Sequence, residues 1–257
     1  MKSLPPNIVL TEASAADLPA IAETARVAFL SDTHTQLKDL VNGGSWFTSS
    51  DAQQWLQSLL DNPQIDIIVA RNQEIPPDRS PTEVYPAPIA GFSIWGKRNY
   101  DDTTNSAPAA PPGPRPPAPM HPSLPVHRPL TVRDLEFITN QSMADWQGYF
   151  CPPSVRCRFV VSCSVRPEYQ GRGIGGALLR WGIDKCDDEG VYCWVQSSMG
   201  ALRAYEAVGF TEVGRLELNL DDFSEGHSRH DGKGWGIYVW PYMRREPTIL
   251  RSGDGDA

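Results

Sequence analysis

The spacing of apolar residues predicts alternating strands and helices along most of the chain. In the first hundred residues it predicts, in order, a strand at 7–12, a helix from Ser14 to Phe29, a helix at 51–60 capped by Ser50, and antiparallel strands at 65–70 and 89–95. Residues 32–49 are polar and interrupted by glycine, so we predict a loop there. Further along, the pattern predicts a helix from Thr131 to 146–149, a strand ending at Val165, a helix to Asp188, a strand at 191–196, a short helix at 200–208, and strands at 211–220 and 234–243. This order indicates one α/β domain over 1–257, with a right-handed parallel crossover after Val165.

Two segments depart from this pattern. Residues 101–129 are dense in proline and contain almost no large apolar side chain. Such a stretch cannot form a core, so we predict a disordered or polyproline-like insertion there, and a flexible tail over 246–257. The insertion is either a tolerated surface loop or a docking segment for proline-binding modules.

Charge and cysteine content narrow the class of protein. The net charge of −8 argues against nucleic-acid binding through a basic surface and would favour cationic substrates such as protonated amines. No apolar run approaches the ~20 residues of a membrane helix, and the first residues form no signal-peptide core. Five cysteines at irregular spacing indicate reduced thiols, and Cys157 and Cys163 share the parity of one strand face, where we expect small core residues. We therefore expect a cytoplasmic protein, with the nucleus left open, that binds no membrane, nucleic acid or metal.

A glycine-rich segment, Gln170 to Gly176, precedes the helix that follows Val165. Glycines at a helix start let an anion approach the unpaired amides of the first turn, so the expected ligand is a phosphate or pyrophosphate. The segment fits both the dinucleotide pattern GxGxxG and the acyl-CoA pattern Q/R-x-x-G-x-G/A. A dinucleotide site would place the glycines directly after the strand and an acidic residue at the end of the next one. Here Pro167 to Gln170 intervene and the next strand ends in Gln196, which favours acyl-CoA.

Two motifs together resemble the GCN5-related N-acetyltransferase (GNAT) superfamily. Residues 165–175 are similar to its acyl-CoA loop, and Tyr205-Glu206-Ala207-Val208-Gly209-Phe210 is similar to its Y-x-x-x-G-F signature. The similarity is close over 157–218 and weaker from the N-terminus to Arg98, in a manner typical of fungal members. It implies an α/β fold with a GNAT-like mixed central sheet, mostly antiparallel, with a parallel splayed pair flanked by helices.

The resemblance also implies a function. It implies an N-acetyltransferase that uses acetyl-CoA as acyl donor and transfers the acetyl group to an amine by direct attack in a ternary complex. The alternative is a non-catalytic acyl-CoA-binding or regulatory module with the same fold. Pantetheine would pair with the main chain at the strand end, the pyrophosphate would lie on the glycine loop, and Tyr205 would protonate the departing sulfur. The implied acyl-CoA residues are Cys163, Ser164, Val165, Gln170, Gly171, Arg172, Gly173, Ile174, Gly175, Gly176 and Ser198.

Several roles stay open at this stage. Arg172 either adds charge to the phosphates or is solvated, and Ser198, where many relatives carry Asn, is expected to cap the short helix. No general base can be assigned, because no carboxylate lies between Arg156 and Arg166, where some relatives carry a catalytic Glu. The acceptor, a small-molecule or peptide amine, would be bound by loops, here 32–49, 74–88 and 221–233, which show no selective pattern. Strand edges near the C-terminus would permit a homodimer.

Overall fold

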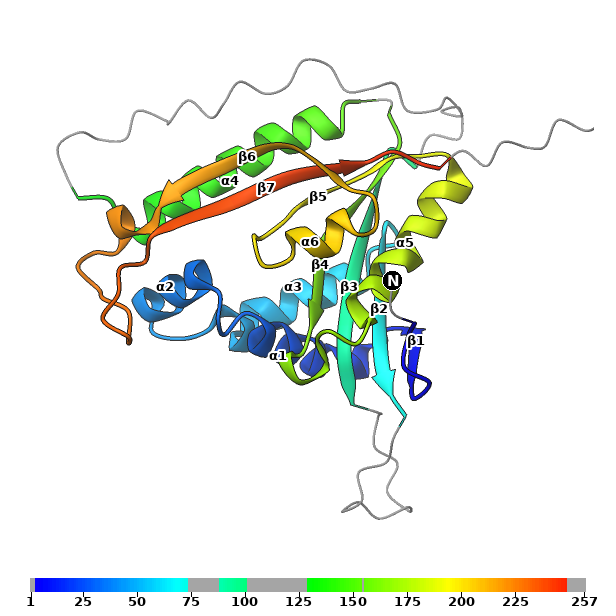
Figure 1. Cartoon of the computed structure of the whole chain (residues 1–257), viewed down its shortest axis with the longest axis horizontal. Helices are drawn as coiled ribbons and strands as arrows, with labels where there is room; N and C mark the ends of the chain where they lie inside the picture. The colour runs from blue at the N-terminus through cyan, green and yellow to red at the C-terminus, as the bar shows by residue number, and fades with distance from the viewer. Residues whose placement is uncertain (1–2, 74–87, 101–128, 154, 249–257) are drawn as a thin grey trace, which may run out of the picture.

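The computed structural model describes residues 3–73, 88–100, 129–153 and 155–248, and these ranges form a mixed α/β fold around one sheet (Figure 1). The strands are β1 (Ile8–Glu12), β2 (Ile65–Asn72), β3 (Ile89–Arg98), β4 (Cys157–Val165), β5 (Cys193–Gln196), β6 (Thr211–Asn219) and β7 (Ile237–Arg245). The helices are α1 (Leu18–Ala28), α2 (Thr33–Asn42), α3 (Ser50–Leu60), α4 (Val132–Phe150), α5 (Ile174–Glu189) and α6 (Leu202–Glu206). Single 3-10 turns are η1 (Ala15–Asp17), η2 (Trp46–Thr48), η3 (Pro167–Tyr169) and η4 (Leu220–Phe223). The predicted insertion up to 128, loop residues 74–87 and the tail from 249 lie outside the described residues.

The sheet has the strand order β1-β2-β3-β4-β5-β7-β6. All neighbouring strands are antiparallel except β4 and β5, which are parallel and joined through α5. The predicted fold class, a mostly antiparallel mixed sheet with one parallel pair, is therefore confirmed. In Figure 1 the strands β5, β7 and β6 run across the view at a wide angle to β2, β3 and β4, so the sheet opens between β4 and β5.

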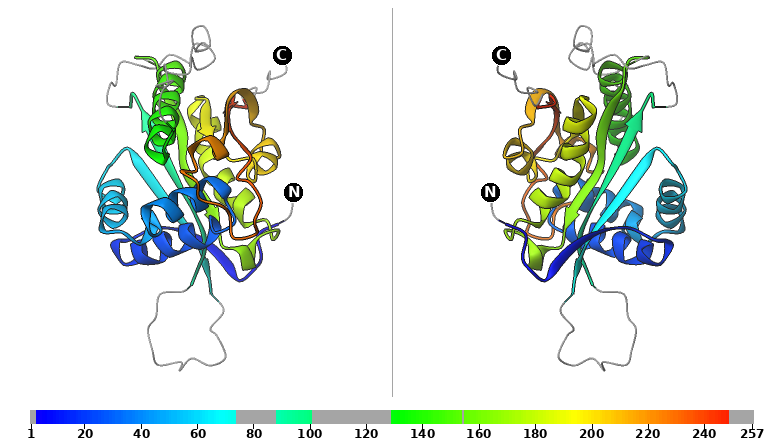
Figure 2. Two further views of the ribbon diagram at one scale, coloured as in Figure 1. Left: turned by 90° about the vertical axis from the view of Figure 1, so that its left-hand side faces the viewer. Right: turned by 90° about the vertical axis from the view of Figure 1, so that its right-hand side faces the viewer.

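Helices cover both faces of the sheet (Figure 2). On one face, α1 and α3 pack their buried Ile21 and Leu56 against β2 and β3, and α4 packs Trp146 and Phe150 against β5 and β7. On the other face, α5 packs against β3 and β4, and α6 packs beside it. Separate apolar cores therefore lie on the two faces of the sheet.

Both predicted capping boxes form, although the first caps the 3-10 turn η1 and the helix predicted from Ser14 begins only at Leu18. Ser14 and Asp17 form a capping box at η1, directly before α1, and Thr131 and Asp134 form another at the start of α4. The predicted cap of α3 is wrong by one residue, because the Ser49 hydroxyl accepts the amide of Ala52 and the helix begins at Ser50. One serine follows another there, and either could have served.

The loop predicted over 32–49 is wrong, because α2 and η2 occupy most of it. Asp32 caps α2 by accepting the amide of Thr35, and Gly43 ends it with φ of 74°. Leu37 is the only residue of α2 that is fully buried, so the helix shows no continuous apolar stripe in the sequence.

Helix length and hydropathy also bear on membrane insertion. Among the described residues, no helix combines the length and apolar character needed to cross a bilayer.

Candidate active site

The centre of the site is the place where β4 and β5 part. They pair only at Arg158 with Cys193 and at Phe159 with Trp194. Past this point β5 continues along β7, and the Ser197 amide donates to the carbonyl of Pro241. The second half of β4 therefore has a neighbouring strand on the β3 side only.

A β-bulge in β4 decides which main-chain groups face the opening. Trp95 of β3 is opposite Val160 and Ile94 is opposite Ser162, so Val161 is an extra residue in β4. The Arg166 amide donates to the carbonyl of Ala90, which directs Arg166 and, by alternation, Ser164 toward β3. The main-chain groups of Cys163 and Val165 consequently point into the opening.

The same bulge corrects the prediction for two cysteines. Cys157 belongs to the core beside α4, together with Phe150 and Trp194, whereas Cys163 packs against the core beside α5. They lie on opposite faces because the extra residue reverses the alternation of side chains between them. Nothing in the run Phe159-Val160-Val161 distinguishes a bulge from a regular strand.

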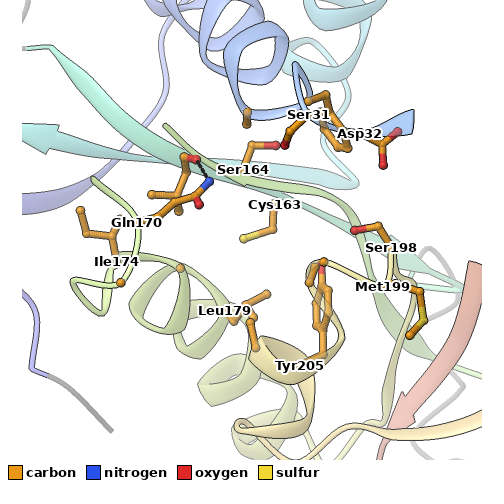
Figure 3. Close-up of a pocket in the computed structure, with 18 of the residues that line it drawn as sticks. Ser31, Asp32, Cys163, Ser164, Gln170, Ile174, Leu179, Ser198, Met199 and Tyr205 are labelled. Carbon is orange, nitrogen blue, oxygen red and sulfur yellow. Dashed lines mark hydrogen bonds between the residues drawn. The ribbon is translucent and has the colours of Figure 1, made fainter. Parts of the chain in front are cut away.

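The glycine loop turns the chain from β4 into α5. The Arg166 guanidinium pairs with Glu168 at 2.8 Å within the turn, and the Gln170 side chain donates to the carbonyl of Val165 at 3.0 Å (Figure 3). Gly171 and Gly173 have φ values of 72° and 86°, which side chains other than glycine rarely adopt. Gly173 is the N-cap of α5, so the unpaired first-turn amides of this helix lie beside the bare backbone.

A cavity of about 700 Å³ joins these parts. It is lined by the end of β4, the glycine loop, the first turn of α5, the start of α6, the end of α1 with residues 31–33, and the start of β7. Most residues implied as acyl-CoA ligands line it, namely Cys163, Ser164, Val165, Gln170, Gly171, Gly173, Ile174, Gly175, Gly176 and Ser198. Arg172 does not line it and is exposed, with its guanidinium 5.5 Å from the ring centre of Tyr169.

Tyr205 of α6 lines the same cavity with its ring buried (Figure 3). The ring packs edge-on against Phe210 at 5.4 Å, and the hydroxyl makes no hydrogen bond with any described residue. Burial raises the pKa of Tyr205 well above its ordinary value, so the phenol keeps its proton at neutral pH. The Tyr205 hydroxyl is thus protonated, lies beside Cys163 and has no hydrogen-bond partner among the described residues.

The parts of this site fit an acyl-CoA donor. The opening offers main-chain partners along Cys163 and Val165, as an extended pantetheine arm requires, and the first turn of α5 offers amides to an anion. No Asp or Glu occurs among the described residues that line the cavity near the glycine loop, so nothing there repels phosphate.

Comparison with known proteins agrees with this geometry. Residues 142–210 match the family model Acetyltransf_1, the Acetyltransferase (GNAT) family, and this segment runs from α4 past the glycine loop and Tyr205. Arylalkylamine N-acetyltransferase 2 from Aedes aegypti is 14% identical with a TM-score of 0.54, the comparison covering 94% of this chain and 100% of that one. Mosquito arylalkylamine N-acetyltransferase like 5b is 17% identical with a TM-score of 0.54, covering 93% of this chain and 99% of that one. This is a GNAT-superfamily fold.

At such identities the solved structures show the GNAT fold alone. A mutant agmatine N-acetyltransferase in its apo form gives a similar result, at 14% identity and a TM-score of 0.50, with 93% of this chain and 99% of that one covered. A search of curated proteins found no match. None of the comparisons supports the narrower resemblance to fungal members.

Ser198 has a different place in the GNAT fold from the one predicted. The N-cap of α6 is Ala201, and it receives no side-chain hydrogen bond. The carbonyl of Ser198 accepts the amide of Ala201 at 3.1 Å, which leaves the hydroxyl at the cavity wall (Figure 3). The prediction of a side-chain cap is therefore wrong, because a turn of main-chain bonds precedes the helix.

Sequence analysis missed one side of the site. A second cavity of about 250 Å³ shares Asp32, Cys163 and Tyr205 with the first and adds His34 and Trp240. Of the predicted acceptor loops, only 32–49 reaches these cavities within the described residues, and the start of β7 contributes in place of 221–233. The Tyr238 hydroxyl donates to Asp32 at 2.5 Å, a contact across 206 positions that no local pattern reveals.

Burial sets the state of the histidine in this second cavity. It lowers the pKa of His34 to about 4, and Lys38 adds to the effect. The imidazole is therefore neutral at pH 7, and its ring packs 5.0 Å from that of Trp240.

Proposed function

We propose that the protein is an acetyl-CoA-dependent N-acetyltransferase that acts by direct attack of an amine in a ternary complex. The observation that carries the proposal is the opening of β4 from β5 directly beside the glycine-capped start of α5, within one cavity that also holds Tyr205. Acyl-CoA would place its phosphates on the amides of α5 and its pantetheine arm along Cys163 and Val165. Its thioester would then lie at the narrow end of the opening.

The chemistry asks little of the chain besides positioning. The amine nitrogen forms a bond to the acetyl carbon, the carbon–sulfur bond breaks, and the amine proton leaves to solvent. Tyr205, which stays protonated, donates its proton to the departing sulfur to give the free thiol and takes a proton back from solvent, so that no net proton is lost. The exposed main chain of the bulged β4 segment offers amides to the negative charge that develops on the carbonyl oxygen.

A route through an acetyl-cysteine is disfavoured. Cys163 is the one cysteine among the described residues that line the two cavities. Burial raises the pKa of its thiol to about 12, so the nucleophilic thiolate is scarce at neutral pH. Direct attack by the amine avoids this step.

Two side chains near the proposed reaction centre could accept the proton of the amine, and neither is a strong base. Asp32 and neutral His34 are the titratable side chains of the second cavity that could take a proton, either directly or through water. The amine class itself is supported by the names of two structural neighbours, which describe acetylation of arylalkylamines and of agmatine. Both have a TM-score of at least 0.50.

Calorimetric titration of the whole protein with acetyl-CoA, with NADH as the control ligand, tests the donor site. We expect micromolar binding of acetyl-CoA and none of NADH. Acetylation of a panel of primary amines, followed by release of free thiol, then tests turnover. Binding without turnover of any amine would support the alternative of a regulatory acyl-CoA module, and absence of binding would reject both.

A further inference from the structure

The charged side chains that line the two cavities, within the described residues, are of one sign. Among the described residues that line them, Asp32 is the sole carboxylate, and no Lys or Arg is present. His34 adds no charge, because burial keeps its imidazole neutral. A ligand in this space therefore meets one negative charge and no positive one.

Three hydrogen bonds hold the carboxylate of Asp32 in place and leave one of its acceptor positions unused. One oxygen accepts the Thr35 amide at 2.8 Å and the Thr35 hydroxyl at 2.9 Å, and the other accepts the Tyr238 hydroxyl at 2.5 Å. A carboxylate offers about four acceptor positions, so one remains on the oxygen that faces Tyr238. A cap of α2 alone would need only the bond to Thr35.

Aromatic rings form the walls around this charge. Tyr238 and Trp240 pack with their ring centres 4.5 Å apart, and Phe29, the residue after α1, also lines this cavity. The buried Nε2 of His34 has no hydrogen-bond partner among the described residues, so it is available to an N–H group. The volume of about 250 Å³ lies at the lower end of small-molecule sites.

We propose that the acceptor is a small primary amine with a single positive charge and an aromatic or similarly apolar body, whose ammonium group binds Asp32 before it loses its proton and attacks. The body packs against Phe29, Tyr238 and Trp240. This proposal rests on the proposed function and names the acceptor of the same site. A polyamine would leave its second cation without a carboxylate, and an amino acid would leave its own carboxylate without a cation.

Two acceptors of the same shape isolate the charge. 2-Phenylethylamine is cationic at pH 7, whereas O-benzylhydroxylamine is neutral, and both carry a phenyl ring two atoms from the reactive nitrogen. The variant is Asp32→Asn, since Asn caps a helix as well as Asp and so preserves α2. Glu217→Gln, at an exposed position of β6, is the control for the loss of one negative charge.

We expect Asp32→Asn to lower kcat/KM for 2-phenylethylamine by about 30-fold or more, chiefly through KM, and for O-benzylhydroxylamine by less than about threefold. Acetyl-CoA affinity stays unchanged in the same variant, and Glu217→Gln changes kcat/KM for neither acceptor.

Equal losses for both acceptors, or no loss, would overturn the ammonium site, as would a wild type that prefers spermidine or phenylalanine. If the wild type prefers spermidine or phenylalanine, acetylation of that amine would still support the proposed function. A wild type that binds acetyl-CoA and acetylates no amine would reject both.

Discussion

At the scale of single residues, burial decides the chemistry of the site more than residue type does. Tyr205, Cys163 and His34 are all titratable, and burial shifts each of them toward its neutral form. The phenol and the thiol keep their protons, and the imidazole lacks one. Asp32 is the one carboxylate on the cavity walls of the described chain, so the proposed recognition of a charged acceptor depends on this residue.

Tyr205→Phe tests the proton donor. We expect kcat to fall on the order of 10²-fold, because the leaving sulfur loses its hydrogen-bond donor, while acetyl-CoA affinity stays the same. Because the folded pKa of Tyr205 is raised, the wild-type rate should show no loss from phenol ionisation up to pH 10. Steady-state kinetics and calorimetry measure the two quantities. An equal loss in affinity and rate would instead assign Tyr205 to packing against Phe210.

At the scale of elements, two glycines in helices have opposite surroundings. A Cβ at Gly182 of α5 would lie 2.1 to 2.5 Å from three indole atoms of Trp95, which is fully buried. A Cβ at the exposed Gly148 of α4 would meet no atom within 4 Å. Gly182 thus lets α5 approach β3 closely, whereas Gly148 has no packing role.

The two Gly→Ala variants should therefore change stability in opposite directions. Gly148→Ala should raise the free energy of unfolding by about 0.5–1 kcal/mol, because alanine loses less backbone entropy in a helix. Gly182→Ala should lower it by about 1–3 kcal/mol, because overpacking against Trp95 outweighs that gain. Urea unfolding measures both. A stabilised Gly182→Ala would show that α5 can move away from the sheet without cost.

Two variants at Gly173, at the start of α5, separate the effect of charge from the effect of backbone strain. Gly173→Ala and Gly173→Glu share the strain of a side chain at φ of 86°, on the order of 1–2 kcal/mol, but only Glu adds a negative charge at the helix start. We expect Glu to weaken acetyl-CoA binding at least tenfold more than Ala, about 1.4 kcal/mol. Calorimetry on both folded variants gives the comparison. Equal affinities would mean that the phosphates do not approach this helix.

At the scale of the whole molecule, buried ion pairs connect segments distant in the sequence. The Arg71 guanidinium of β2 donates to both oxygens of Asp17, which is almost fully buried in η1. Arg158 of β4 likewise pairs with Glu189 at 2.6 Å and Asp66 at 3.0 Å below the point where the sheet opens. Such pairs make the stability of the whole fold sensitive to pH.

Asp17→Asn should expose this sensitivity. The hydrogen bond from Arg71 lowers the pKa of Asp17 from 3.8 to about 2 in the folded state. Its contribution, about 2 kcal/mol, is therefore complete above pH 3.8 and is lost as the pH falls toward 2. The variant should be less stable than wild type at pH 7, and the difference should shrink in acid. Urea unfolding from pH 7 to pH 2.5 measures it, and a difference that does not change with pH would contradict the assignment. The surface variant Glu217→Gln should show no such trend.

Local patterns predicted the elements that carry their own signals. The glycine loop, the capping boxes at Ser14 and Thr131, and the parallel pair around α5 agree with the structure. The helix α2 escaped prediction because Leu37 alone is fully buried in it, and its start depends on the single cap Asp32. The wall of the second cavity escaped prediction because it joins residues 32–35 to residues 238–240, which only the folded chain brings together.

The extra residue Val161 determines which main-chain groups of β4 face the cavity. If Val161 were instead paired with β3 as a regular strand residue, every side chain of the glycine loop and Tyr205 would stay in the sequence, yet alternation would run uniformly along β4. The amides and carbonyls of Cys163 and Val165 would then turn into the sheet, and those of Ser164 would turn outward. That change of pairing would alter the cavity wall as thoroughly as the loss of a reactive group, although no reactive group had been lost. The pairing of this strand, and not only its composition, decides which main-chain groups line the cavity.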